Sequence, residues 1–216
     1  MIRRLPGLPV ALATVLLVAG NMARAQPDPA ADAPDPGPRT VYAGPALASY
    51  PQALQTWRRP EEVNGWIGAR FEYDNARALQ LSESLREGGK APPIAEPASF
   101  FERPLGVCVD LARFAVETVR TVAPELRASY LMIEFEPLLR SGQVLRRHWI
   151  ATYRRGDAHY FFADSRYPGR IYGPYPTVQA FVAEYAQLRQ RRVVAYREVE
   201  SFRRQPRAAA KQKAGA

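Results

Sequence analysis

Three side chains of this sequence could together perform nucleophilic catalysis. Cys108, His148 and Asp164 supply a thiol, an imidazole and a carboxylate, which are the nucleophile, the base and the orienting acceptor of covalent acyl transfer. Cys108 is the chain's one cysteine, His148 follows it after 40 residues, and Asp164 follows His148 after 16. We expect the three side chains to meet in the fold as a catalytic triad.

The elements that must position these side chains can be predicted from their surroundings. From Cys108, apolar residues recur at helical spacing up to Val122 and Pro124 closes the pattern, so we expect a helix that begins at the cysteine. A helix N-terminus offers unpaired N–H groups and a partial positive charge, which stabilise a thiolate and an oxyanion. His148 and Asp164 lie in two predicted strands, which a short turn would bring together.

The pattern resembles the catalytic core of the transglutaminase-like superfamily. The resemblance rests on Gly-x-Cys-x-Asp over 106–110, on His148 before an aromatic residue and on the strand-ending Asp164, and it covers about 66–174. It implies a papain-like fold with Cys108 as nucleophile, His148 as general base and acid, and Asp164 orienting the imidazole. The implied activity is acyl transfer through a thioester, to water or to an amine, on a protein or peptide substrate. We expect no cofactor and no metal.

Other interpretations of the same residues remain open. A lone cysteine is often a buried small hydrophobe, His148 could be a core histidine, and Asp164 could be a turn acceptor. Asp110 is expected to be structural. His159 stands 11 residues after His148, where a related class of Cys-His peptidoglycan amidases has its third residue, although a strand-edge role is the simpler interpretation.

The second donor of an oxyanion hole is not evident. Residues 99–105, just before the cysteine, contain no Gln or Asn, and the candidate substitutes are Trp66, Tyr73 and Asn75. Because this second donor is missing, a second hypothesis stays open. In it, the domain is catalytically inactive and serves as a periplasmic binding or assembly module.

The N-terminus predicts export. Residues 1–25 combine a positive start at Arg3, an apolar stretch at 8–20 and a small-x-small cleavage site at 23–25, which is typical of a secretory signal. The 13 apolar residues are fewer than the roughly 18 to 20 that span a bilayer. We therefore expect cleavage before Gln26, no stable membrane insertion afterwards, and a periplasmic or secreted protein.

Charge and cysteine content exclude several classes. The net charge of +9 includes three basic residues in the signal and five in the tail, with no acid in either, so 26–202 is left with about +1. A segment with so small a net charge gives no reason to expect nucleic acid as a partner. One cysteine rules out an internal disulfide framework, and one cysteine with two histidines cannot build a Cys-rich zinc site.

Composition divides the chain into four parts. After the signal at 1–25 comes a Pro-rich linker at 26–45, then one transglutaminase-like domain at 46–202, and then a basic disordered tail at 203–216. The domain is predicted to be α+β, because helices precede a run of antiparallel strands. The expected helices are 46–57, 60–71, 74–87, 108–122 and 177–190, the last capped by Thr177. The expected strands are 128–136, 144–153, 159–164 and 192–199, with irregular loops at 90–105 and 165–176.

Overall fold

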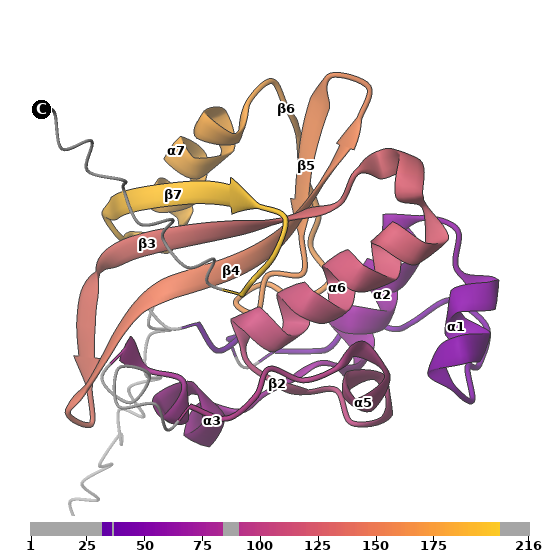
Figure 1. Cartoon of the computed structure of the whole chain (residues 1–216), viewed down its shortest axis with the longest axis horizontal. Helices are drawn as coiled ribbons and strands as arrows, with labels where there is room; N and C mark the ends of the chain where they lie inside the picture. Colours follow the sequence, from indigo (N-terminus) through magenta and orange to yellow (C-terminus); the bar gives the residue numbers. More distant parts are fainter. Residues whose placement is uncertain (1–31, 36, 84–90, 204–216) are drawn as a thin grey trace, which may run out of the picture.

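The computed structural model describes residues 32–35, 37–83 and 91–203, which form helices and an antiparallel sheet (Figure 1). The predicted signal at 1–25 and almost all of the predicted tail lie outside the described residues. The helices are α1 (Tyr50–Thr56), α2 (Pro60–Arg70), α3 (Asn75–Gln80), α5 (Pro97–Glu102), α6 (Cys108–Val122) and α7 (Val178–Arg189), with a 3-10 turn at Pro124–Leu126. The expected mixture of helices and strands is confirmed.

The main sheet holds five strands in the order β6-β5-β4-β3-β7, and neighbouring strands are antiparallel. A short parallel pair, β1 with β2, lies apart from it. The strands are β1 (Glu72–Tyr73), β2 (Leu105–Gly106), β3 (Ser129–Arg140), β4 (Gln143–Arg155), β5 (Ala158–Phe162), β6 (Tyr172–Tyr175) and β7 (Val193–Val199). The strands β3 to β6 follow one another in sequence and in space, as the predicted meander requires.

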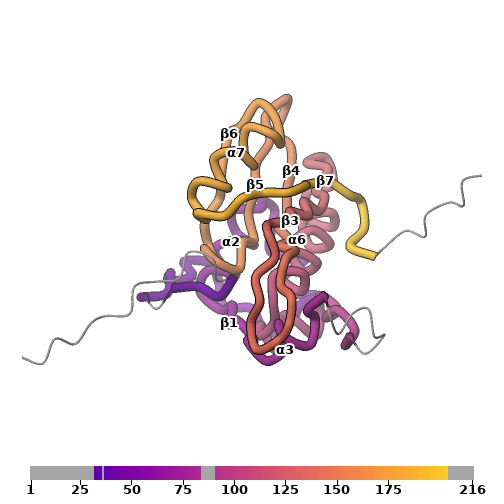
Figure 2. The backbone as a smooth tube through the Cα atoms, turned by 90° about the vertical axis from the view of Figure 1, so that its left-hand side faces the viewer, coloured from indigo at the N-terminus to yellow at the C-terminus, as the bar shows by residue number. Residues whose placement is uncertain are grey.

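Two hydrophobic cores cover the two faces of this sheet. Alternate residues of β4 face opposite ways, so Trp149 and Ala151 join the core around α6, while Ile150 joins the core around α7. Helices α1, α2 and α5 pack around α6 (Figure 1). Figure 2 shows α7 beside β5 and β6, away from α6. The sheet therefore carries the helix that begins at Cys108 on one face and α7 on the other.

Two segments that we expected to be irregular contain regular structure. The segment 90–105 includes α5, which Pro97 opens at a position where a helix needs no N–H, and which buries Phe100 and Phe101. The segment 165–176 includes β6, whose Pro174 is tolerated because β6 is an edge strand with little need for a ladder donor there. Pro97 and Pro174 thus both fall where a backbone donor is dispensable, so the proline content of these segments was misleading.

Other boundaries also differ from the predictions. The strands β3 and β4 continue to Arg140 and from Gln143, so the predicted connection at 137–143 is mostly a long hairpin. Its turn needs a positive φ, which Gly142 supplies at 74°. Helix α3 ends at Gln80, before the predicted end at 87, and 84–90 lie outside the described residues.

Candidate active site at the start of helix α6

Cys108 is the first residue of α6, as predicted, and it is 7% exposed. The turn before it is fixed by Asp110, which is fully buried. The Asp110 carboxylate accepts hydrogen bonds from the backbone N–H of Val107 (3.1 Å) and from Arg77 Nε (2.7 Å) and Nη2 (2.8 Å). These contacts agree with the structural role expected for Asp110, and they hold the thiol at the helix N-terminus.

His148 lies on β4 just beyond the end of β5. The ladder between β4 and β5 ends at the pair Ala151 and Phe162, so the edge of β4 is open beside His148. The chain then turns at Ala163, which has a positive φ of 55°, and this turn brings Asp164 back toward β4. Its Oδ1 lies 3.1 Å from His148 Nε2, and both side chains are fully buried. The predicted meeting of His148 and Asp164 is confirmed.

The structure also brings Cys108 to this pair. The Cys108 sulfur, a ring nitrogen of His148 and a carboxylate oxygen of Asp32 lie within 4.8 Å of one another. Because Nε2 is directed at Asp164, Nδ1 is the imidazole nitrogen on the side of Asp32, whose Oδ1 lies 3.3 Å away. Cys108, His148 and Asp164 therefore form a linked group, and a fourth residue lies among them.

That fourth residue was not foreseen. Asp32 comes from the predicted linker, and its side chain is only 15% exposed. Its carboxylate also forms an ion pair with Nη2 of the fully buried Arg189, at 2.6 Å. Nothing in a Pro- and Ala-rich segment indicates such a contact.

Helix α7 supplies two further side chains that the sequence analysis missed. The hydroxyl of Tyr185 donates to Asp164 Oδ2 (2.9 Å) and lies 3.1 Å from His148 Nε2. Arg189 Nη1 donates to this hydroxyl at 2.7 Å, and Tyr172 of β6 also donates to Asp164 Oδ2, at 2.8 Å. The spacing of Tyr185 and Arg189, one helical turn apart, was the one available signal. Together these contacts fix the carboxylate that orients His148.

Charge inside the group favours a protonated imidazole. Burial alone would lower the pKa of His148, but the Asp32 and Asp164 carboxylates outweigh it and raise this pKa well above 6.5. For Asp164, burial alone would raise the pKa. The hydrogen bond to His148 outweighs burial and lowers the pKa of Asp164 below 3.8. With Asp32 in place, the two carboxylates on either side of His148 thus favour the protonated form of its imidazole.

This arrangement predicts how stability depends on pH. Because the pKa of His148 is raised on folding, its contribution is present below about pH 6.5 and is lost as the pH rises through the folded-state pKa. Because the pKa of Asp164 is lowered, its contribution is present above about pH 3.8 and is lost in stronger acid. Urea unfolding between pH 3 and pH 9 should show the free energy of unfolding falling on both sides of this window. His148→Gln should abolish the alkaline decline, and an unchanged decline in that variant would contradict the assignment.

The same atoms could in principle ligate a metal ion. Cys108, His148 and Asp32 offer a sulfur, a nitrogen and an oxygen, which are ligands that Zn²⁺ accepts. However, the Arg189 guanidinium lies 2.6 Å from the Asp32 carboxylate, and a permanent positive charge there repels a divalent cation. The donor set fits proton transfer better than metal binding.

Of the three candidate oxyanion donors, Tyr73 is the one that lines the same cavity as the thiol. A cavity of about 40 Å³ has Cys108, Tyr73 and Asp32 in its wall. Burial, together with the charges of Asp32 and Cys108, raises the pKa of Tyr73, so its hydroxyl keeps its proton and can donate it. Asn75 instead lines a neighbouring cavity of about 170 Å³, and Trp66 stacks on Phe101 in the core with ring centroids 4.8 Å apart.

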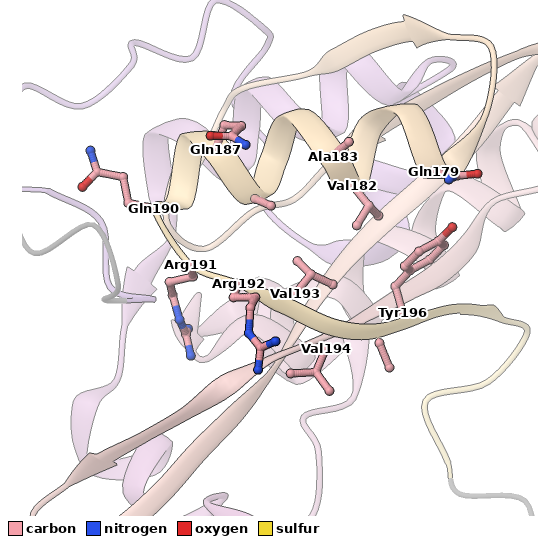
Figure 3. Close-up of a pocket in the computed structure, with 12 residues that line it drawn as sticks. Gln179, Val182, Ala183, Gln187, Gln190, Arg191, Arg192, Val193, Val194 and Tyr196 are labelled. Carbon is pink, nitrogen blue, oxygen red and sulfur yellow. The ribbon is translucent and has the colours of Figure 1, made fainter.

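Two other features lie outside this group. His159 is on β5, stacks against Phe161 and pairs with Tyr175 of β6, so Asp164 rather than His159 meets His148. A larger hollow of about 790 Å³ lies between α7 and β7 (Figure 3). Its wall includes Gln187, Arg192 and Tyr196 but no cysteine or histidine, so it offers neither a thiol nor an imidazole.

Comparison with known proteins adds no family to this geometry. No protein-family model matches the chain, and no curated protein matches it. Among the described residues, none of the helices combines the length and the apolar character that a membrane span requires. The chemistry of the site itself is therefore the evidence for a function.

Proposed function

We propose that this protein is an exported, cysteine-dependent acyl-transfer enzyme of the transglutaminase-like type, with a papain-like core. It would act as a peptide or amide hydrolase or transfer the acyl group to an amine, on a protein or peptide of the cell envelope. One observation carries the proposal: His148 lies between the thiol at a helix N-terminus and the buried carboxylate of Asp164. This is the order of groups that nucleophilic catalysis by cysteine needs.

The proposed reaction proceeds through a thioester. His148 Nδ1 takes the proton of Cys108, and the sulfur attacks the carbonyl carbon of the substrate. The negative charge that develops on the carbonyl oxygen is stabilised by the N–H of Cys108 and the hydroxyl of Tyr73. The imidazolium then protonates the leaving amine as the C–N bond breaks. Water or a second amine, deprotonated by His148, attacks the thioester and restores the thiol.

The other buried residues hold the imidazole in place. Asp164 accepts from His148 Nε2, which leaves Nδ1 to take the proton of the thiol. Tyr172 and Tyr185 fix the Asp164 carboxylate from the opposite oxygen. In this proposal they are positioning residues, because none of them contacts the reacting atoms.

The reactivity of Cys108 tests the proposal. Purified chain is treated with iodoacetamide at pH 7, both as it stands and with Asp32→Ala, because Asp32 lies beside the thiol. An ordinary thiol is only a few per cent ionised at this pH, so a thiolate paired with an imidazolium should alkylate about 10-fold faster than free cysteine. If neither chain reacts faster than free cysteine while both remain folded by circular dichroism, the enzyme proposal is wrong. The inactive binding module is then the better hypothesis.

A further inference from the structure

Residues 32–35, which belong to the predicted linker, are bound to the domain. Ser165 Oγ donates to the backbone carbonyl of Asp32 at 2.9 Å, and Arg166 Nη1 donates to that of Ala33 at 2.8 Å. Arg166, which is only 4% exposed, also forms an ion pair with Asp35 at 2.6 Å. Ser165 and Arg166 directly follow Asp164, so the loop that supplies the orienting carboxylate also binds this segment.

The Asp32 side chain lies where the reaction has to occur. Its Oδ1 is 3.3 Å from His148 Nδ1, the nitrogen that must take the thiol proton. A carboxylate beside that nitrogen favours the protonated imidazole, which has no lone pair to accept the thiol proton, and a negative charge beside the sulfur opposes formation of the thiolate. Asp164 already orients the ring through Nε2, so Asp32 adds nothing that the triad lacks.

The small volume of the cavity beside Cys108 also indicates that Asp32 hinders access to the sulfur. The cavity bordered by Cys108 and Asp32 measures about 40 Å³, whereas ordinary ligand pockets measure about 300 to 1,000 Å³. The adjoining cavity of about 170 Å³ is also bordered by Asp32, together with Ala33. Asp32 thus borders both small cavities beside the thiol, and its carboxylate takes up space that an acyl group bound to the sulfur would need.

We propose that residues 32–35 act as a tethered inhibitor, in which the Asp32 carboxylate occupies the acyl-binding position until the segment is released. The inference rests on the proposed function, since it names how the same site is regulated. The inhibitor is part of the chain, so its effective concentration is high and its occupancy does not depend on dilution. Release requires the loss of the ion pairs to His148, Arg189 and Arg166.

Alkylation of Cys108 by iodoacetamide at pH 7 measures this occupancy in the full chain. Asp32→Ala should raise the rate constant about 10-fold or more, because about 1.4 kcal/mol of lost binding opens the site by that factor. Asp35→Ala removes one anchor and should raise the rate only a few-fold. Asp157→Ala is the matched control, since Asp157 is exposed in the turn between β4 and β5, and it should leave the rate unchanged.

The outcomes separate this inference from the proposed function. If Asp32→Ala leaves the rate unchanged or lowers it, Asp32 does not block the site and the inhibitor role is overturned. The enzyme proposal survives that result as long as the rate exceeds that of free cysteine and still falls with His148→Gln. If no chain reacts faster than free cysteine, the proposed function fails and the inhibitor role fails with it.

Discussion

His148→Gln is expected to lower the alkylation rate of Cys108 by about 10-fold or more at pH 7, to the level of an ordinary buried thiol. Glutamine has a similar length but cannot take a proton, so the thiol loses the group that draws its proton away. The effect should be measured with iodoacetamide in the chain that carries Asp32→Ala, where the tethered carboxylate no longer covers the sulfur. Turnover, once a substrate is found, should fall by about 100-fold or more.

The chain provides a matched control for this substitution. His159 is also largely buried on a strand, but it lies outside the group around Cys108, so His159→Gln should leave the alkylation rate unchanged. Thermal unfolding of both variants shows whether either has lost its fold. Equal losses in the two variants would mean that the fold, and not proton transfer, was affected, whereas a loss in His159→Gln alone would favour the amidase arrangement.

Phe114→Ala is expected to reduce the free energy of unfolding by about 3 to 5 kcal/mol. Phe114 lies on α6, is fully buried, and its ring centroid is 5.1 Å from those of Trp66 and Phe100. Its removal leaves a cavity among rings that α2 and α5 bring to α6, and rigid aromatic neighbours cannot collapse into the space.

Urea unfolding of the folded chain measures this loss. Leu139→Ala is the control, because Leu139 is 74% exposed at the tip of the β3–β4 hairpin, and its truncation should change the free energy by no more than about 0.5 kcal/mol. A loss below about 1 kcal/mol for Phe114→Ala would show that the aromatic core does not anchor α6. Cys108 would then depend on the Asp110 contacts alone for its position.

Local patterns were sufficient for the elements that carry Cys108 and His148, whereas Asp164, which was expected to end a strand, lies two residues beyond the end of β5. The predicted helix at 108–122 agrees with α6 at both ends, because its apolar spacing is regular and Pro124 cannot continue it. Thr177 caps α7 as expected, accepting from the N–H of Ala180. Where the pattern was weak the prediction was wrong: α5 is held by the burial of Phe100 and Phe101, a contact that proline content could not reveal.

The sequence by itself determined which residues could do the chemistry and which elements carry them, since residue type and hydrophobic period are local properties. Only the tertiary structure decided what surrounds them. Asp32 and Arg189 are 157 positions apart, and neither shows a periodic signal that relates it to the other. A buried ion pair forms only after two cores have closed around it and removed water from both charges. For that reason the thiol could be found from the sequence, but the carboxylate that lies beside it could not.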